Sequence, residues 1–407
     1  MRKHLQTSCF LLAVALTSLV NIAIAEQSTP ATTAPDKDYL VYIVCEGADR
    51  IVLARFGPGG IKVDHERPIG TTPHDINGPH GIAVSKDKQF YYVSLGHGRP
   101  YGSLWKYSSD GDKELGHVTL GYFPATTDVT PDGGFVYTVN FNLHGDMVPS
   151  SVSVVAADSM LEIARIPTCT MPHGSRFNPQ GTKHYSVCMM DDMLVEIDTS
   201  TFKVARYFVL TKGKEEGKIG SPADSTDARK ASTSVHSSTH DMQPSSSAPA
   251  AASAHNVTCS PTWAQPSSDG SAVYVACNKS NEILEINTNS WTITRRFPAG
   301  NGVYNLAASS DGRLLVATNK KDQSASVFDL KTAKELARIP TKRKLVHGAA
   351  ISPDNRYAFV TVEGVGEQPG TLEVIDLSSL KDVASLDLPP QAAGIDFFRI
   401  EPAKQAP

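Results

Sequence analysis

A segment of 17 residues recurs six times along this chain, each time with the same order of apolar, turn and β-branched residues. The copies are PHGIAVSKDKQFYYVSL (79–95), PATTDVTPDGGFVYTVN (124–140), PHGSRFNPQGTKHYSVC (172–188), PTWAQPSSDGSAVYVAC (261–277), VYNLAASSDGRLLVATN (303–319) and VHGAAISPDNRYAFVTV (346–362). Their starts are separated by 45, 48, 89, 42 and 43 residues, so one interval is double the others. A fixed period of this length indicates an array of supersecondary units that bury their apolar faces against one another.

Each repeat predicts four short antiparallel strands. An apolar first strand leads into a turn such as TPDGG, SSDG or SPDN, in which Gly accepts a positive φ and Pro presets its own φ. The second strand, as in FVYTVN, is rich in β-branched and aromatic residues. A third strand such as LEVIDL and a fourth such as ELARIPT complete the unit. Four strands in about 40–45 residues are typical of a β-propeller blade.

The two ends of the chain supply a seventh blade. DYLVYIVCEG, DRIVLARFG and IKVDHERPIG have the pattern of strands two to four, and AAGIDFFRI near the C-terminus has the pattern of a first strand. Pairing them closes the ring and removes two open sheet edges. The sequence therefore predicts an all-β protein, a seven-bladed β-propeller of four-stranded antiparallel blades over residues 39–407, closed by the C-terminal strand.

The second-strand sequences VYTVN and LLVATN are similar to the motif that names the YVTN-type β-propeller repeats. The resemblance extends over roughly residues 39–400 and implies the propeller fold. Related propellers include lactonase-like and streptogramin-lyase-like enzymes, the haem d1 domain, the amine dehydrogenase heavy chain and the catalytic domain of nitrous oxide reductase. A fold shared with enzymes does not by itself imply enzymatic activity.

Residues 1–25 predict a secretory signal peptide. Positive charge in MRKH precedes the apolar run CFLLAVALTSLV, and small residues in AIA end at Ala25. The apolar run is too short to span a bilayer, and no other stretch is long and apolar enough. We expect cleavage before Glu26, a disordered leader over residues 26–38, and a periplasmic or secreted protein without a membrane span.

The charge balance and the missing motifs narrow the possible functions. The chain has 38 Lys and Arg against 42 Asp and Glu, a net charge of −4, which argues against a nucleic-acid partner. It has no C-x-x-C-H, H-E-x-x-H or G-x-S-x-G motif and no phosphate-binding glycine loop. Covalently bound haem and the common hydrolase mechanisms are therefore not expected.

The doubled interval contains a segment of different composition, residues 211–256. It is rich in Ser, Ala, Thr, Pro and charged residues and lacks an apolar β pattern, so we expect a disordered insertion and not an eighth blade. It is either a tolerated loop expansion or a mobile metal-collecting or lid segment. The residues that would act in the second case are His236, His240, Asp241, Met242 and His255.

Histidine opens three of the seven inner strands. In the repeat alignment the opening residues are Ala393, His80, Ala125, His173, Thr262, Tyr304 and His347, and Gly follows each His. Because inner strands surround the central axis, we expect their starts to crowd one mouth of the channel. Loops at the same rim bring further His and acidic residues: His74, Asp75, His97, His144, Glu46, Asp191, Asp192 and Glu363.

These histidines have three interpretations. Imidazole binds Zn, Cu and Ni, so His80, His173, His347, His97 and His144 predict a transition-metal site, with Cu or Zn as the candidate ion. A lyase- or lactonase-like enzyme would instead use His173 and His347 as acid and base, with Arg176 or a bound cation stabilising an anionic intermediate. Alternatively, the histidines hydrogen-bond the backbone of neighbouring blades or are copies left by duplication. Nitrous oxide reductase holds its copper with more histidines at the comparable mouth. The strand start PHGIAV resembles the strand starts of streptogramin-lyase-like enzymes, but it occurs in one blade only.

Four of the five cysteines after the signal peptide hold paired positions in two blades. Cys169 and Cys259 precede first strands, and Cys188 and Cys277 end the second strands of the same blades. Export permits disulfides, so the spacing predicts Cys259–Cys277 and Cys169–Cys188, with Cys45 left over. The alternatives are buried free thiols, or thiolates that join a copper site with a neighbouring methionine. The methionines in question are Met171, Met189 and Met190.

We therefore expect an exported propeller that acts as a binding module and takes a transition-metal ion or a protein partner at its His-rich mouth. The alternatives are the lyase- or lactonase-like enzyme and an interaction scaffold with no small ligand. The sequence leaves catalysis open and favours a non-enzymatic role.

Overall fold

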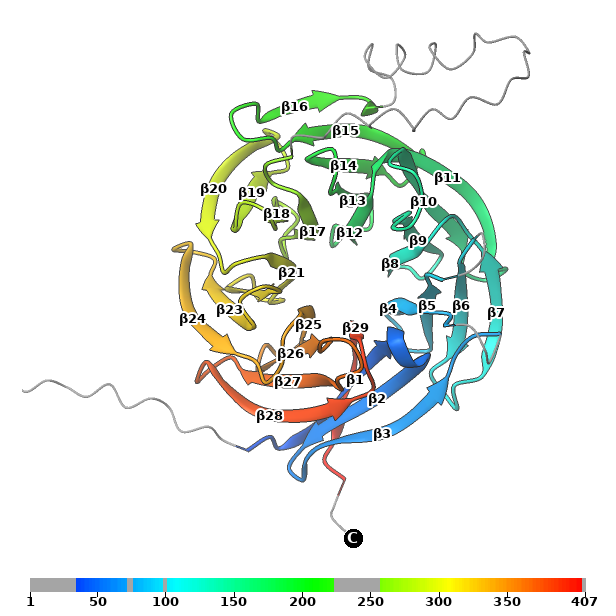
Figure 1. Ribbon diagram of the computed structural model, residues 1–407, viewed down its shortest axis with the longest axis vertical. Coiled ribbons are helices and arrows are strands. Elements are labelled where there is room, and N and C mark those ends of the chain that lie inside the picture. The colour runs from blue at the N-terminus through cyan, green and yellow to red at the C-terminus, as the bar shows by residue number, and fades with distance from the viewer. Residues whose placement is uncertain (1–33, 72–75, 98–100, 223–256, 405–407) are drawn as a thin grey trace, which may run out of the picture. The chain divides into compact units, whose positions relative to one another are not determined.

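The computed structural model describes residues 34–71, 76–97, 101–222 and 257–404. In this part of the chain, seven antiparallel sheets surround a central channel, each with one edge strand at the axis and the opposite edge outside (Figure 1). A short 3-10 helix, η1, covers Glu46–Ala48. The predicted all-β, seven-bladed β-propeller is confirmed.

Seven blades follow one another around the axis in chain order. From the axis outward, blade 1 contains β29 (Ala392–Pro402), β1 (Lys37–Cys45), β2 (Arg50–Gly57) and β3 (Gly60–Pro68). In the same direction, blade 2 contains β4 (Pro79–Val84), β5 (Phe90–Leu95), β6 (Ser103–Ser108) and β7 (Glu114–Thr119). Blade 3 contains β8 (Pro124–Val129), β9 (Phe135–Asn140), β10 (Pro149–Ala156) and β11 (Leu161–Thr170).

The second half of the ring has the same arrangement. Blade 4 contains β12 (Pro172–Phe177), β13 (Lys183–Cys188), β14 (Met193–Asp198), β15 (Lys203–Val209) and a fifth strand, β16 (Glu216–Ile219). Blade 5 contains β17 (Pro261–Pro266), β18 (Ala272–Cys277), β19 (Glu282–Asn287) and β20 (Thr292–Pro298). Blade 6 contains β21 (Val303–Ala308), β22 (Leu314–Asn319), β23 (Ser324–Asp329) and β24 (Lys334–Pro340). Blade 7 contains β25 (Val346–Ile351), β26 (Tyr357–Val362), β27 (Gly370–Asp376) and β28 (Lys381–Leu388).

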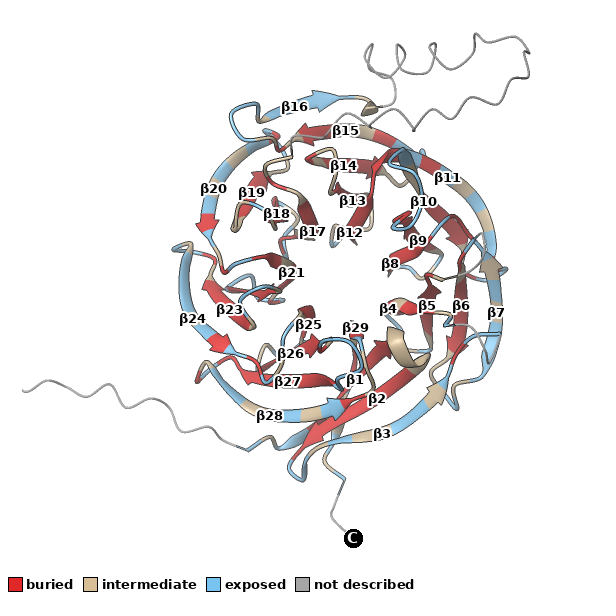
Figure 2. Ribbon diagram, viewed as in Figure 1, coloured by how far each residue is buried: buried red, intermediate tan, exposed pale blue. Residues whose placement is uncertain are grey.

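Burial decreases from the inner strands to the outer strands (Figure 2). The second strands β22 and β26 are buried at every position, because both of their faces pack against neighbouring blades. The fourth strand β20 has exposed residues at every second position over most of its length, since one of its faces meets solvent. This difference explains why second strands are continuous apolar runs in the sequence and fourth strands are mixed.

The turn after the first strand has a repeated hydrogen-bond pattern. In four blades a Ser hydroxyl donates to the Asp two residues later at 2.6 Å, in the pairs Ser85–Asp87, Ser267–Asp269, Ser309–Asp311 and Ser352–Asp354. The same Ser oxygen accepts the N–H that begins the second strand, as Ser309 does from Leu314 at 2.8 Å. These side-chain bonds to the local backbone fix the hairpin, which explains why Ser and Asp recur there.

Blade 1 joins the two ends of the chain. β29 pairs antiparallel with β1, from Lys37↔Pro402 to Cys45↔Ala392, as predicted for ring closure. Buried Arg55 of β2 ties three strands together: its Nη1 donates to Asp38 and to Glu401, each at 2.9 Å, and its Nε donates to Asp64 at 2.7 Å. The seam therefore consists of main-chain pairing and a buried cation held between three carboxylates.

Two predicted boundaries are wrong. Glu216–Ile219 lies inside the insertion expected to lack regular structure, but it forms β16 by pairing with the open outer edge of β15. Lys37 and Asp38 were expected in the leader but belong to β1, because β29 and Arg55 bind them.

The predicted signal peptide, residues 1–25, and the rest of the insertion, residues 223–256 with His236, His240, Asp241, Met242 and His255, lie outside the described residues. In the described ranges no helix is long and apolar enough to cross a membrane.

Candidate functional site at the channel mouth

Glycine follows histidine in three inner strands because the neighbouring blade comes too close for a side chain. A Cβ on Gly81, Gly174 or Gly348 would lie 2.2, 2.3 or 2.7 Å from a carbonyl oxygen of the next inner strand. Such contacts are far below van der Waals distance and would push the strands apart. The glycines therefore serve the packing of the blades, and they hold the preceding histidines at the starts of β4, β12 and β25.

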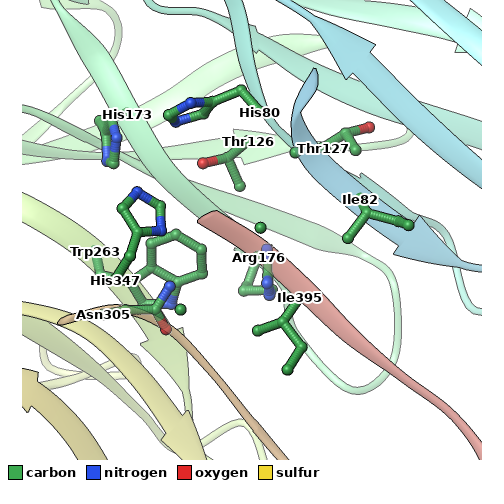
Figure 3. A pocket seen from close by; sticks show the side chains of 13 residues that line it. His80, Ile82, Thr126, Thr127, His173, Arg176, Trp263, Asn305, His347 and Ile395 are labelled. Carbon is green, nitrogen blue, oxygen red and sulfur yellow. The ribbon is translucent and has the colours of Figure 1, made fainter. Parts of the chain in front are cut away.

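The imidazoles of His80, His173 and His347 lie together at the mouth of the channel (Figure 3). The ring centre of His80 is 6.1 Å from that of His173 and 5.5 Å from that of His347. Tyr304, which is the second residue of β21, has its ring centre 5.3 Å from His173 and 4.9 Å from His347. Four inner strands thus contribute rings to one small space.

His173 has a defined protonation state. Its Nδ1 lies 2.8 Å from the carbonyl oxygen of Thr262, which can only accept, so Nδ1 carries the proton. Burial, and then the neighbouring His80, lowers the pKa of His173 to about 3, which leaves the ring neutral at pH 7. The lone pair on Nε2 then accepts a hydrogen bond from the Tyr304 hydroxyl at 3.0 Å.

His347 is buried without any hydrogen bond. Neither of its ring nitrogens has a partner among the described residues, although only 4% of the residue is exposed. Oε1 of Glu363 lies 3.6 Å from Nε2, beyond hydrogen-bond distance. Burial, followed by the charge of Lys320, holds the pKa of His347 well below 6.5, so this ring is also neutral at pH 7. Both nitrogens are therefore available to a ligand.

Glu46 links His80 to a second pair of histidines. Its Oε2 lies 2.8 Å from Nδ1 of His80, and its Oε1 lies 3.0 Å from Nε2 of His97. Burial would raise the pKa of Glu46, but the charges and hydrogen bonds of His80 and His97 outweigh burial and lower it. The bond to Glu46 in turn raises the pKa of His97. His144 is exposed, with its ring centre 5.6 Å from that of His97, so these two predicted ligands lie beside the group of three.

The first residue after a second strand also reaches the mouth. Glu46, Lys320 and Glu363 share this place in the repeat, and Lys320 Nζ donates to Oε1 of Glu363 at 2.8 Å and lies 4.4 Å from the Tyr304 ring centre. Glu46 and Glu363 were expected at the rim from the sequence. Lys320 was not, although the repeat alignment places it at the same position. A search for charged residues of either sign at this position of the repeat would have found Lys320.

Asp191 and Asp192, expected as rim ligands, bind backbone instead. Asp192 is 1% exposed and accepts the N–H groups of Thr258 and Ser260 at 2.5 and 2.7 Å. Asp191 accepts the N–H of Thr170 at 2.6 Å. Both carboxylates hold segments that lead into inner strands, β12 and β17, so these bonds serve the fold.

A small cavity continues from the imidazoles into the channel. Its volume is about 20 Å³, which is space for one or two water molecules. Arg176, Trp263 and Asn305 line it together with His173 and His347. The three residues assigned to the alternative enzyme, His173, His347 and Arg176, therefore share this cavity. Trp263 and Asn305 were not selected from the sequence, because nothing in their local pattern distinguishes them from core residues.

Four of the cysteines are paired in the structure. Cys169 is bonded to Cys188 and Cys259 to Cys277, and Cys45 is a buried free thiol. Burial raises the pKa of Cys45 to about 12, so it is not a thiolate at pH 7. Thiolate ligation by the four bonded cysteines is excluded, and the methionines considered with them, Met171, Met189 and Met190, pack against an apolar cluster that includes Phe123 and Phe141.

Two further predicted residues, His74 and Asp75, lie outside the described residues. Within the ranges that the structure describes, no group of three or more His, Cys, Asp or Glu side chains is arranged to hold a metal ion.

Comparison with known proteins supports the fold. No family model and no curated protein matches the chain. Many solved structures do match, and two of them serve as examples. Hydrazine synthase of Kuenenia stuttgartiensis has a TM-score of 0.58 and 17% identity over 80% of this chain and 93% of that one. A functionally unknown protein from Desulfotomaculum acetoxidans DSM 771 has a TM-score of 0.62 and 14% identity over 88% of this chain and 98% of that one. At such identities the similarity shows the propeller fold alone.

Proposed function

We propose that this protein is an exported β-propeller that binds one transition-metal ion, zinc or copper, through His80, His173 and His347. The observation that carries the proposal is His347, whose two buried ring nitrogens have no partner in the described structure. A buried polar group without a partner is costly unless a ligand or water satisfies it. Here it lies beside two other imidazoles, and imidazole is a preferred ligand of these ions.

The ring separations from His80 suit an ion shared with its two neighbours. Imidazole nitrogens that bind one zinc ion at about 2.0–2.1 Å place their ring centres roughly 5–6 Å apart. The separations from His80 to His347 and to His173, 5.5 and 6.1 Å, lie within and slightly above this range. Because no group of side chains in the described ranges is yet arranged as a metal site, binding requires side-chain rotation, in which the ion replaces the Tyr304 hydroxyl at Nε2 of His173.

The outer nitrogens of two rings are already oriented. Nδ1 of His173 is fixed by the Thr262 carbonyl, and Nδ1 of His80 is fixed by Glu46. A metal-bound histidine usually donates its second N–H to a carbonyl or carboxylate in this way. The low pKa values of His173 and His347 keep both rings unprotonated at pH 7, so protons do not compete with the ion.

A lyase- or lactonase-like activity is the second candidate. It is favoured by one observation, that His173, His347 and Arg176 line the same cavity. The size of the cavity argues for the ion, because pockets for organic ligands typically measure about 300–1,000 Å³ and this one measures about 20 Å³. Turnover of a lactone or cyclic depsipeptide would reverse this ranking.

Calorimetric titration of Zn²⁺ into chelator-treated, untagged protein tests the proposal. We expect one binding site per chain at pH 7.5, and Co²⁺ should show the visible absorption of a histidine-bound ion. His347→Ala should weaken binding by more than about 100-fold, since removal of groups that merely orient a ligand already costs about 10–100-fold. Unchanged affinity in this variant, or no binding of Zn²⁺ or Cu⁺, would overturn the proposal.

Two controls make the titration specific. His117→Ala removes an exposed histidine of β7, so it should bind zinc as the wild type does. The histidines at 236, 240 and 255 are replaced by Ser in a parallel series, so that binding outside the described residues is counted separately.

Export remains part of the proposal, as does membership of the YVTN-type repeats. The two disulfides support export, because such bonds persist in oxidising compartments. Mass spectrometry of the protein from its native host should give a mature N-terminus at Glu26, whereas a retained N-terminal segment would contradict cleavage.

A further inference from the structure

Arg176 places a positive charge inside the channel. It is the fifth residue of β12, its guanidinium carbon lies 4.6 Å from the centre of the Trp263 ring, and it lines the small cavity. Its one hydrogen bond within the described residues goes from Nη1 to the carbonyl of the adjacent Ser175, at 2.9 Å. In the same ranges no carboxylate lies within ion-pair distance of it.

Two other arginines stacked on aromatic rings in this protein are neutralised. Arg206 lies 4.0 Å from the Trp291 ring centre and donates to Glu196 at 2.5 Å. Arg295, 5.3 Å from the ring centre of Phe297, donates to both carboxylate oxygens of Glu285. Arg176 differs from these two arginines by the absence of a described anionic partner. It shares this with Arg67, which stacks on Tyr107 and, within the described residues, donates to backbone carbonyls only.

The cavity also contains a buried donor with nothing to bind. The indole Nε1–H of Trp263 has no partner in the described structure, although the residue is only 4% exposed. Oδ1 of Asn305, another residue lining the cavity, is unpartnered as well, and an amide can present either its oxygen or its NH₂ group after a flip. Arg176 and Trp263 line the same cavity, and a guanidinium and an unpartnered N–H are donors that can bind an anion.

The nearby acids are already engaged. Asp128 accepts the N–H groups of Phe177 and Val129 at 3.0 and 2.9 Å. Burial raises the pKa of Asp128, and the charge of Arg176 opposes this rise. Asp396 accepts the N–H groups of Val84 and Phe397 in the same manner.

We propose that the channel binds one small inorganic monoanion, of the size of chloride, bromide or nitrite, between the Arg176 guanidinium and the Trp263 indole N–H. The volume of about 20 Å³, which is space for one or two water molecules, suits an anion of this size. His173 and His347 line the same cavity, so the anion would lie next to the proposed metal site, but its binding requires no metal ion at the mouth.

Bromide is the probe, used on chelator-treated protein in a chloride-free buffer. Thermal unfolding is followed as NaBr replaces Na₂SO₄ at constant ionic strength, because a ligand that binds the folded state raises Tm with its concentration. The difference between wild type and Arg176→Gln isolates specific binding from the general salt effect. We expect Tm of the wild type to rise relative to Arg176→Gln as bromide replaces sulfate.

Two further variants keep the test decisive. Trp263→Phe retains the ring and removes the N–H, so it should also lose the bromide effect, even if Arg176→Gln fails to fold. Arg313→Gln, an exposed arginine paired with Asp311, should respond as the wild type does. In crystals grown with NaBr, an anomalous peak is expected within hydrogen-bond distance of Arg176. Equal bromide responses in wild type and Trp263→Phe, or no peak at Arg176, would overturn the proposal.

Discussion

At the scale of single residues, His173 serves the fold and the candidate site together. Its Nδ1–H joins blade 4 to blade 5 through the Thr262 carbonyl, while its Nε2 faces Tyr304. Hydroxyl groups make the equivalent connection elsewhere, as when Thr318 donates to the carbonyl of His347 at 2.9 Å. The interpretation of these histidines as links between blades is therefore right for His173, whereas His80 bonds the side chain of Glu46.

Replacing Gly174 by Ala tests how tightly the inner strands pack. The new Cβ would lie 2.3 Å from the Thr262 carbonyl oxygen, so we expect Gly174→Ala to lower the free energy of unfolding by about 1–3 kcal/mol. Urea unfolding followed by circular dichroism measures the loss. Gly59→Ala is the matched control, because nothing lies within 4 Å of its Cβ, and it should change little. Equal stability of the two variants would contradict the close approach.

His184 should make the protein sensitive to acid. Burial, and then the charge of Arg176, lowers its pKa to about 3, and neither ring nitrogen has a partner among the described residues. Below pH 6.5 the unfolded chain binds a proton that the folded chain does not, so stability is lost as pH falls. The cost from His184 alone is about 2 kcal/mol at pH 5.

The variant His184→Leu should therefore lose less stability than the wild type between pH 7 and pH 5. The free energy of unfolding, measured in urea at both pH values, gives the comparison. His173 and His347 are unchanged in both proteins and contribute equally. If the wild type and the variant lose the same stability over this range, His184 is not buried in its neutral form.

At the scale of strands and turns, the sequence predicts the structure well because each turn and strand can be compared across several blades. The Ser-x-Asp turns and the apolar second strands recur at fixed positions, so errors in one copy are corrected by the others. β16 was missed because it occurs in one blade only and consists of four exposed residues, without an apolar face to reveal it. A feature that occurs in one blade only cannot be found by comparing the repeats.

The disulfide in blade 5 should stabilise the loop before β17. Cys259 and Cys277 are 18 residues apart in sequence, and a cross-link of this span contributes about 3 kcal/mol by restricting the unfolded chain. We expect the double variant Cys259→Ser, Cys277→Ser to unfold at correspondingly lower urea concentration. If removing both thiols leaves the midpoint unchanged, the bond contributes nothing to stability in solution.

At the scale of the whole molecule, the fold depends on the last strand of the chain. Deletion of residues 392–407 removes β29, which exposes the edge of β1 and takes Glu401 from Arg55. We expect this truncation to abolish cooperative thermal unfolding, because the ring loses its closure and one of its inner strands. Deletion of residues 405–407 alone should leave the Tm unchanged. A truncated protein that still unfolds cooperatively at the wild-type Tm would contradict closure through β29.

The candidate site was predictable in position but not in detail. Alignment of the repeats placed His80, His173 and His347 at inner-strand starts, and a propeller gathers those starts at one mouth. The tautomer of His173, the unpartnered nitrogens of His347 and the ion pair of Lys320 with Glu363 depend on contacts between blades that are far apart in sequence. A single sequence carries no direct signal for such contacts.

Anomalous diffraction at the zinc absorption edge, from crystals of chelator-treated protein soaked in Zn²⁺, tests the central claim most directly. We predict one strong peak at about 2.0–2.1 Å from a ring nitrogen of His80, His173 and His347, with the Tyr304 hydroxyl moved off His173. A zinc peak elsewhere with none at this mouth, or three imidazoles that remain unliganded at saturating zinc, would contradict it.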